Sequence, residues 1–336
     1  MTERHVAVTY DASPEERAVF LEVLADDVSL EFAAGLSPEQ RRSVLEKATA
    51  LLAWNFPREI AASEYDRLDR VELIQLLSAG VDHMPFEDLP PHIAIAGNVG
   101  AYALPMAEHT MGMILALAKR LCVESEKLKH GRFDQHTPTR LLSGMTAGIL
   151  GFGGIGRATS RLMRSFGMRI HAINTTGTSS EPADFIGTLD DLAEVLAVSD
   201  VVVVALPLTR ATHRLIGEEE LCWMKPNAIL INVSRAAILD EEALYRHVKD
   251  HPDFLLGIDA WWTEPFMEGS FRLEYPFLDL PNVLGSPHNS AIVAGGRLIA
   301  ARHAAENIRR FIRGERAMGI VRREDYLQLT SANEPS

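Results

Sequence analysis

The chain has 336 residues, of which 47% are hydrophobic and 24% charged, and its formal net charge is -13 at pH 7. This length favours two domains, and the composition excludes a fibrous or wholly disordered protein. Because acidic side chains outnumber basic ones, we expect neither nucleic acid nor a membrane surface as a partner.

The cysteine content and the N-terminus bear on location. Only Cys122 and Cys222 are present, without the spacing of a metal site or a disulfide framework. The first residues lack the apolar stretch of a signal peptide, and no window reaches membrane-spanning length. We therefore expect a cytoplasmic protein that binds no metal.

In the first part of the chain, short β-rich runs alternate with amphipathic helical stretches. Ser-Pro-Glu sequences at Ser13 and Ser37 are typical helix starts. The alternation predicts a parallel sheet covered by helices. The expected strands are residues 6–10, 28–32, 50–54, 71–77 and 93–96, and a further helix is expected over residues 57–68.

A long apolar helical stretch, residues 104–121, and a polar loop, residues 130–144, lead into a second alternating series. This series predicts a second parallel sheet. Its expected strands are residues 146–150, 169–173, 201–206, 228–233, 254–258 and 282–284. The last helix, residues 293–313, is long enough to return the chain to the first domain.

A glycine-rich sequence lies between strand 148–150 and the helical stretch 157–166. It consists of Gly151, Phe152, Gly153, Gly154, Ile155 and Gly156. A strand, a glycine turn and a helix are the context of the dinucleotide-binding fingerprint, in which backbone amides approach a pyrophosphate at the positive end of a helix. The alternative is a glycine turn without a ligand.

The strand over residues 169–173 ends in Asn174, Thr175 and Thr176. A site selective for NAD usually has an acidic residue at this point, which binds the ribose hydroxyls and repels a 2′-phosphate. That repulsion is missing, although no Arg follows directly. NADP is therefore slightly favoured over NAD, unless these are simply turn residues.

Three segments with titratable side chains follow strands of the second series. They are Asn232-Val233-Ser234-Arg235, Asp259-Ala260-Trp261-Trp262-Thr263-Glu264 and Ser286-Pro287-His288-Asn289-Ser290. Open α/β sheets bind their ligands at the carboxyl ends of the strands. Together with the glycine loop, the segments indicate a nucleotide-dependent enzyme.

At this point the chain resembles the D-isomer-specific 2-hydroxyacid dehydrogenase family. Further similar motifs are Ser78-Ala79-Gly80-Val81-Asp82-His83, Asn98, Ala107-Glu108-His109-Thr110 and Met224-Lys225-Pro226. The resemblance implies two doubly wound domains, one flavodoxin-like and one of the Rossmann type, with the active site in the cleft between them. The substrate domain would comprise residues 1–104 and 296–336, and the dinucleotide-binding domain residues 105–295. It also implies a homodimer.

The resemblance assigns roles that make physical sense. Arg235 would hold the carboxylate of a 2-keto or 2-hydroxy acid. His288 would be the general acid in reduction and the general base in oxidation, with Glu264 orienting its ring and favouring its protonated form. Ser78, Ala79 and Gly80 would also bind substrate. Further cofactor contacts would come from Thr110, Ile155, Leu206, Pro207, Thr212, Val233, Ser234, Asp259 and His288.

Two points concern the substrate and the class of function. Formate dehydrogenases carry Gln at the position of Glu264, which disfavours formate as the hydride donor. The aromatic residues Trp261, Trp262, Phe266, Phe271, Tyr275 and Phe277 could line a pocket for an aromatic acid, or pack the loop or a subunit contact. The alternative functions are a nicotinamide-sensing protein that resembles the corepressors of this family, and a dehydrogenase acting on another small oxyanion.

Overall fold

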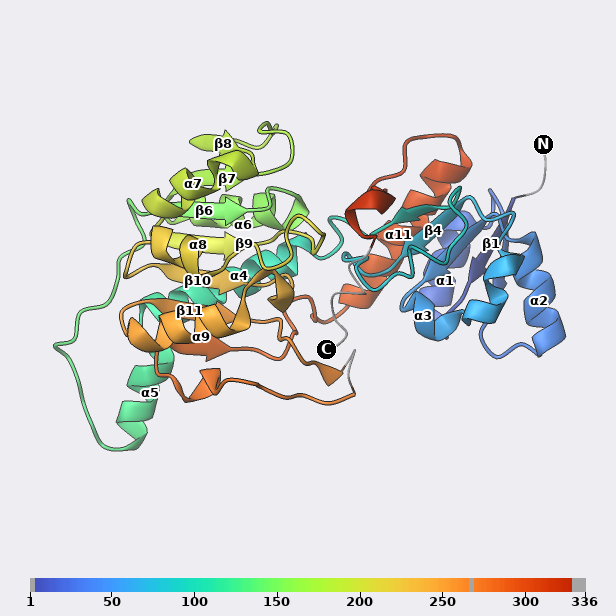
Figure 1. Cartoon of the computed structure of the whole chain (residues 1–336). Coiled ribbons are helices and arrows are strands. Elements are labelled where there is room, and N and C mark those ends of the chain that lie inside the picture. The colour runs from blue at the N-terminus through green and yellow to red at the C-terminus, as the bar shows by residue number, and fades with distance from the viewer. Residues whose placement is uncertain (1–3, 266–268, 328–336) are drawn as a thin grey trace. The chain divides into compact units, whose positions relative to one another are not determined.

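The computed structural model describes residues 4–265 and 269–327 (Figure 1). These residues form two compact units, which divide between Tyr102 and Ala103 and again between Ile292 and Val293. The first unit therefore combines the N-terminal part of the chain with its last part. Both divisions lie within a few residues of the boundaries expected after residues 104 and 295. Phe266 lies outside the described residues.

The first unit contains a five-stranded sheet in the order β2-β1-β3-β4-β5, and every neighbouring pair is parallel. This is the flavodoxin-like strand order, so the expected fold is confirmed. The strands are β1 (His5–Val8), β2 (Ser29–Phe32), β3 (Ala50–Ala53), β4 (Leu73–Leu76) and β5 (Ala94–Ala96). The helices are α1 (Pro14–Leu24), α2 (Pro38–Lys47), α3 (Phe56–Glu59) and α11 (Gly296–Ile312), with the short 3-10 helices η1 (Ala62–Arg67) and η5 (Arg323–Asp325).

Helices α1 and α2 begin where the sequence predicts. Ser13 and Ser37 cap them, and in each case the third helical residue bonds back to the cap. The helix expected over residues 57–68 is instead divided into α3 and η1, because Ile60 has an extended backbone between them. Helix α11 joins the core through small buried side chains, which allow it to lie close to the sheet: Ala300, Ala301, Ala304 and Ala305.

The second unit contains a seven-stranded parallel sheet in the order β12-β11-β10-β9-β6-β7-β8. The order reverses between β6 and β9, as in the dinucleotide-binding doubly wound fold. The strands are β6 (Thr146–Leu150), β7 (Arg169–Ile173), β8 (Phe185–Gly187), β9 (Val201–Val204), β10 (Ile229–Asn232), β11 (Leu255–Ile258) and β12 (Val283–Gly285). The sequence did not predict β8, which is a short, partly exposed strand at the edge of the sheet.

The helices of the second unit differ from the prediction at one point. The helix expected over residues 104–121 ends at Ala118, since Arg120 has a left-handed backbone with φ 55° and a second helix begins after it. The helices are α4 (Ala103–Ala118), α5 (Leu121–Lys129), α6 (Gly154–Ser165), α7 (Leu192–Val198), α8 (Glu218–Trp223) and α9 (Glu241–Asp250), with η2 (Leu189–Asp191), η3 (Ala236–Ile238) and η4 (Phe277–Asp279).

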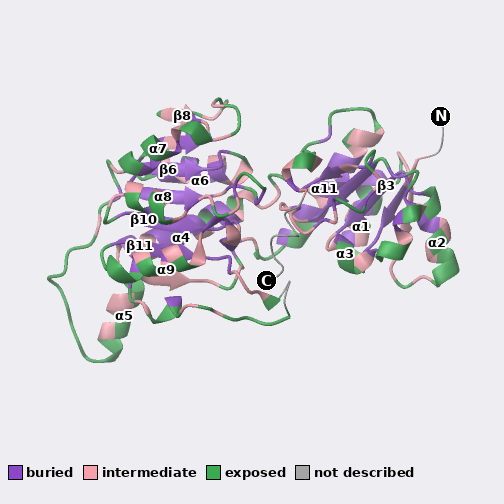
Figure 2. Cartoon of the chain, viewed as in Figure 1, coloured by how far each residue is buried: buried purple, intermediate pink, exposed green. Residues whose placement is uncertain are grey.

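Figure 2 shows that burial follows the sheets in both units, whereas outer helix faces such as those of α2 and α5 are exposed. The central strands β3, β4, β9 and β10 are buried along their whole length, in keeping with their mainly apolar sequences, in which Gln75 and Asn232 are the polar exceptions. Within the described residues, no helix has the length and apolar character needed to cross a membrane.

Candidate active site

The glycine loop follows β6 at the point where the strand order of the second unit reverses. Gly151 has φ 100°, and a β-carbon there would lie 2.5 Å from the carbonyl oxygen of Ala205. A β-carbon on Gly156 would lie 2.1 Å from the carbonyl oxygen of Gly151. Both positions therefore require glycine, the first for the turn and the second for the close approach of helix α6 to the strand.

The start of α6 fits a pyrophosphate. Gly153 is the N-cap residue, provides no side chain to cap the first turn, and has open space where a β-carbon would be. The first turn contains no acidic residue, so the positive end of the helix is not neutralised locally. Gly154 and Ile155 lie in this turn, partly exposed. Free amides at a helix N-terminus bind phosphate groups, so these residues fit a dinucleotide.

Asn174 follows β7 and uses its side chain to fold its own loop. The amide oxygen accepts hydrogen bonds from the backbone amides of Thr176 (3.0 Å) and Gly177 (2.7 Å), and the amide nitrogen donates to the carbonyl oxygen of Thr178 (2.7 Å). Thr175 is exposed at the turn. No carboxylate therefore stands at the end of β7, although Asn174 is less free to donate to a phosphate than its sequence position suggests.

The other expected cofactor residues differ in accessibility. Pro207 is exposed, whereas Leu206 and Val233 are buried. The Thr212 hydroxyl ties its loop together by donating to the carbonyl oxygen of Pro207 (2.6 Å), and the Ser234 hydroxyl donates to the side chain of Asn232 (3.1 Å). Thr110 is fully buried within α4, where its hydroxyl donates to the carbonyl oxygen of Met106 (2.7 Å).

The three catalytic candidates gather at one edge of the second sheet. Strands β10, β11 and β12 are neighbours in register, and Arg235, Glu264 and His288 follow them in that order. The side chain of Asn232 donates to the carbonyl oxygen of Arg235 (3.0 Å), which anchors the backbone there. Parallel topology therefore places side chains from distant parts of the sequence at the carboxyl end of one sheet.

His288 and Glu264 are directly bonded. His288 Nδ1 lies 2.7 Å from Glu264 Oε2, and Glu264 Oε1 accepts a hydrogen bond from the Trp261 amide (2.6 Å). Since an ionised carboxylate only accepts, Nδ1 carries the proton and Nε2 is the nitrogen directed away from Glu264. The Glu264 side chain is 13% exposed and that of His288 37%. This is an oriented imidazole with one accessible nitrogen.

The backbone of His288 has φ 50°. This left-handed conformation costs roughly 1–2 kcal/mol for an L-residue. Residues are held in such a conformation only where their surroundings determine it, and such residues cluster at functional sites.

Asp259 is fully buried behind the histidine loop. Its carboxylate accepts hydrogen bonds from the Ser286 hydroxyl (2.5 Å) and from the amides of Asn289 (3.1 Å) and Ser290 (3.2 Å). Burial alone would raise the pKa of Asp259, but these donors outweigh it and hold the pKa below its usual value. The Ser290 hydroxyl is buried close to the same carboxylate and also helps to hold the pKa of Asp259 down.

Two residues at this edge had no predicted role. His109 Nε2, from α4, lies 3.0 Å from the Ser286 hydroxyl oxygen and 3.8 Å from Asp259 Oδ1. His109 and Ser286 are 177 residues apart, so no spacing in the sequence connects them. Their only sequence signal was that each stands in a segment similar to the family.

The expected substrate loop of the first unit follows β4. The Ser78 hydroxyl donates to the carbonyl oxygen of Gly80 (2.8 Å), and the Ser78 carbonyl oxygen accepts from the Asn98 amide (2.8 Å). Ala79 packs closely against Gly97, where a β-carbon would lie 2.4 Å from the Ala79 carbonyl oxygen. The loop is partly exposed and held in a defined shape.

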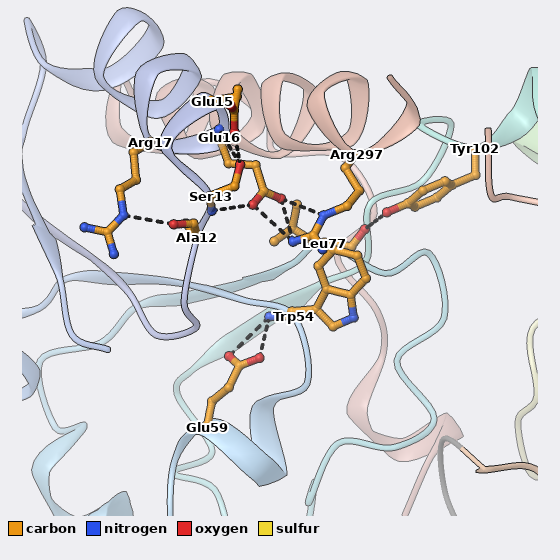
Figure 3. Close-up of polar contacts among 10 residues, drawn as sticks. All are labelled: Ala12, Ser13, Glu15, Glu16, Arg17, Trp54, Glu59, Leu77, Tyr102 and Arg297. Carbon is orange, nitrogen blue, oxygen red and sulfur yellow. Dashed lines mark hydrogen bonds and ion pairs between the residues drawn. The ribbon is translucent and has the colours of Figure 1, made fainter. Parts of the chain in front are cut away.

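A polar cluster beside this loop was also not predicted (Figure 3). Arg297, from α11, donates to both carboxylate oxygens of Glu16, whose side chain is 1% exposed, and its guanidinium lies 4.4 Å from the ring centre of Trp54. Glu59 accepts from the Trp54 amide (3.0 Å). The Tyr102 hydroxyl donates to the carbonyl oxygen of Leu77 (2.7 Å). These contacts join α11 to the carboxyl ends of the first sheet.

The aromatic residues on either side of Glu264 favour the packing alternative. Trp261 is 7% exposed and donates from its ring nitrogen to the carbonyl oxygen of Ser286 (2.8 Å). Trp262 stacks on the buried Phe277, and Tyr275 stacks on Tyr245. Phe271 remains half exposed. The two tryptophans therefore hold the loop together.

Comparisons with known proteins agree with this architecture. The profile of the D-isomer specific 2-hydroxyacid dehydrogenase, NAD binding domain, matches residues 111–290. A D-3-phosphoglycerate dehydrogenase of Methanocaldococcus jannaschii is 29% identical over 90% of this chain, which spans 57% of that relative's length. A glyoxylate reductase of Thermococcus gammatolerans is 29% identical over 93% of this chain, and the match covers 89% of that relative's length.

Solved structures lead to the same group. A crystal structure described as a putative formate dehydrogenase from Pyrobaculum aerophilum superposes with a TM-score of 0.79, at 27% identity over 96% of this chain and 99% of that one. Since the family profile covers more than half of the chain, the chain belongs to the D-isomer-specific 2-hydroxyacid dehydrogenase family of NAD(P)-dependent oxidoreductases.

Proposed function

We propose that the protein interconverts a 2-keto acid and the corresponding D-2-hydroxy acid, with His288, Glu264 and Arg235 as its working residues. The observation that carries this proposal is the pair formed by His288 and Glu264, 2.7 Å apart, at the sheet edge that also bears Arg235. The bound nicotinamide supplies or accepts the hydride. The remaining tasks, binding the acid and transferring one proton, belong to side chains of the protein.

In reduction, the Arg235 guanidinium binds the substrate carboxylate and polarises the neighbouring carbonyl group. His288 Nε2 donates a proton to the carbonyl oxygen of the substrate. The negative charge of Glu264 stabilises the imidazolium before this transfer. In oxidation, neutral His288 removes the proton from the hydroxyl. We also propose that the amides of Ala79 and Gly80 contribute to carboxylate binding, while the Ser78 hydroxyl, bonded to the Gly80 carbonyl oxygen, holds their loop in shape.

The proposal includes acceptance of NADPH, with a slight preference over NADH. Its support is the absence of a carboxylate at the end of β7, where Asn174 closes the loop. Arg161 on α6 pairs with Glu181 (2.9 Å), so that cation is partly neutralised. The ratio of kcat/KM for NADPH and NADH tests this preference. A strong preference for NADH would contradict it.

The proposal extends to location and assembly. Both cysteines, Cys122 and Cys222, have free thiols, in keeping with a reducing cytoplasm. A homodimer is expected from the family, and closed twofold pairing is the commonest soluble assembly. The ligand class is a small 2-keto or 2-hydroxy acid, with neither nucleic acid nor metal.

The experiment that tests the function is the initial rate of NADPH and NADH oxidation with glyoxylate, hydroxypyruvate, pyruvate, phenylpyruvate and branched 2-keto acids. Arg235→Lys and His288→Ala should retain cofactor binding but lose most turnover. Normal rates in both variants would rule out the proposed roles. Tight cofactor binding with no turnover would instead support a nicotinamide-sensing protein.

A further inference from the structure

The loop that carries His288 is wrapped around a single buried residue, Asp259. Its carboxylate accepts from the Ser286 hydroxyl on one side of His288 and from the amides of Asn289 and Ser290 on the other. The His288 amide itself donates to the backbone carbonyl oxygen of Asp259 (2.8 Å). The backbone conformation of His288 is therefore set by Asp259.

Ser286 connects this arrangement to helix α4. Its hydroxyl donates its only proton to Asp259 Oδ1, so its oxygen is left to accept from His109 Nε2, 3.0 Å away. His109 must then carry its proton on Nε2. The result is a chain of donors running from His109 through Ser286 to the buried carboxylate.

Trp261 also holds Ser286, independently of His109. The carbonyl oxygen of Ser286 accepts from the ring nitrogen of Trp261 (2.8 Å), and the amide of Trp261 donates to Glu264, the partner of His288. Only one residue thus lies between Ser286 and the His288 backbone, namely Asp259, and only one lies between Ser286 and Glu264, namely Trp261. Residues joined in one hydrogen-bond network act together, so a change at Ser286 should alter the site beyond Ser286 itself.

We propose that His109 and Ser286 are positioning residues for His288, which act through Asp259 to hold the histidine loop in its left-handed conformation. This inference rests on the proposed function for its kinetic consequences but not for its structural ones. Neither residue needs to touch the substrate or the cofactor. Their effect is on where Nε2 of His288 is presented.

The test compares Ser286→Ala and His109→Leu with the conservative variants Ser286→Thr and His109→Gln, which keep a hydroxyl and a side-chain nitrogen at the required places. Ser199→Ala is the matched control, since Ser199 is a buried serine of the same unit whose hydroxyl donates to the Val195 carbonyl oxygen. The readouts are kcat and KM for the best 2-keto acid of the panel, NADPH affinity by fluorescence titration, and histidine ring signals by NMR without ligands.

We expect Ser286→Ala and His109→Leu to lower kcat by roughly tenfold, the effect of about 1.4 kcal/mol, with NADPH affinity unchanged. The His288 ring signals, assigned with His288→Gln, should shift or broaden in both. Ser286→Thr, His109→Gln and Ser199→Ala should stay close to the unmodified protein in each readout.

Two results would overturn the proposal. Weaker NADPH binding at unchanged kcat would show that the chain serves the cofactor, and unchanged His288 signals would show that the loop does not depend on it. If the unmodified protein reduced none of the acids, the proposed function would fail, while the ring signals would still decide the roles of Ser286 and His109.

Discussion

Glu264 is fixed at both of its carboxylate oxygens, one by the His288 ring and the other by the Trp261 amide. A group held in this way has two separable effects on the histidine. It sets the direction of the ring, and it supplies a negative charge close to Nδ1. The first effect needs only an acceptor, whereas the second needs ionisation.

Glu264→Gln should separate these effects, because glutamine keeps an acceptor but has no charge. We expect kcat for 2-keto acid reduction to fall by roughly tenfold or more, since the protonated imidazole loses its stabilisation, and kcat for oxidation to fall less. Rates in both directions provide the measurement, with the exposed Glu242→Gln as a control. An equal loss in both directions would mean that Glu264 only positions the ring.

The side chain of His247 should make the stability of the protein depend on pH. Burial, and next the nearby His251, lower its pKa to about 4 from 6.5, and its Nε2 is buried without a hydrogen bond. The folded state therefore binds fewer protons than the unfolded state between these values, so stability is complete above pH 6.5 and is lost as the pH falls towards 4.

His247→Gln should remove this dependence. From pH 8 to pH 5, the unfolding free energy of the variant should fall by about 1 kcal/mol less than that of the unmodified protein. This figure allows for the partial exposure of the His247 ring. Urea unfolding at the two pH values measures the difference. His136→Gln, at an exposed histidine of the same unit, is the control, and parallel pH profiles of His247→Gln and the unmodified protein would contradict the assignment.

At the scale of elements, the sequence predicted the sheets better than their edges and breaks. Central strands such as β9, four valines that follow Asp200, are continuous apolar runs, which leaves few alternatives. Strand β8 has three residues of mixed burial, too few for a period to emerge. The break between α3 and η1 depends on the extended backbone of Ile60, a choice made by tertiary packing.

Two glycines in the turn between β6 and α6 are needed for different reasons. The fold needs Gly151, whereas the proposed cofactor needs Gly153. Gly151→Ala should destabilise the protein by roughly 2 kcal/mol or more, since φ is 100° and the Ala205 carbonyl oxygen is too close. Gly153→Ala meets nothing within 4 Å and should leave stability unchanged.

The Gly153→Ala methyl group would nevertheless stand at the start of α6, so cofactor affinity should fall by roughly tenfold. Thermal unfolding and NADPH titration measure the two effects. Normal NADPH affinity in folded Gly153→Ala would argue against a pyrophosphate at this helix end.

The candidate site was predictable where one strand end supplied each residue. Glu264 and His288 each follow a strand, and adjacent parallel strands bring such positions together. The bond between His109 and Ser286 and the pair of Glu16 with Arg297, 281 residues apart, join a helix to a remote segment. No local pattern encodes such contacts, because they depend on how helices α4 and α11 pack.

At the scale of the whole molecule, α5 and the loop after it expose several large apolar side chains. They are Leu121, Leu128, Phe133 and Leu141, each at least 55% exposed. Apolar side chains exposed along one helix and the loop after it suit a surface that another chain covers. We propose that this segment forms the twofold contact of the proposed homodimer.

Phe133→Glu should therefore weaken the dimer, because it places a charge where an apolar side chain would be buried. Sedimentation velocity over a range of concentrations measures the shift towards monomer. Phe166→Glu, at an exposed phenylalanine after α6, is the matched control. A Phe133→Glu dimer as stable as the unmodified one would place the contact elsewhere.

Helix α11 belongs to the first unit but is synthesised after the second. Its alanines pack with Val6, Val8, Leu52 and Leu73 in one apolar cluster. While residues 103–292 are being synthesised, that face of the N-terminal sheet is covered only in part, by α1 through Phe20, Val23 and Leu24. The second unit is continuous in sequence and can complete its fold first. The face of the N-terminal sheet on which α11 packs stays partly exposed until α11 has been synthesised. The newborn chain should therefore depend on chaperones most during this interval.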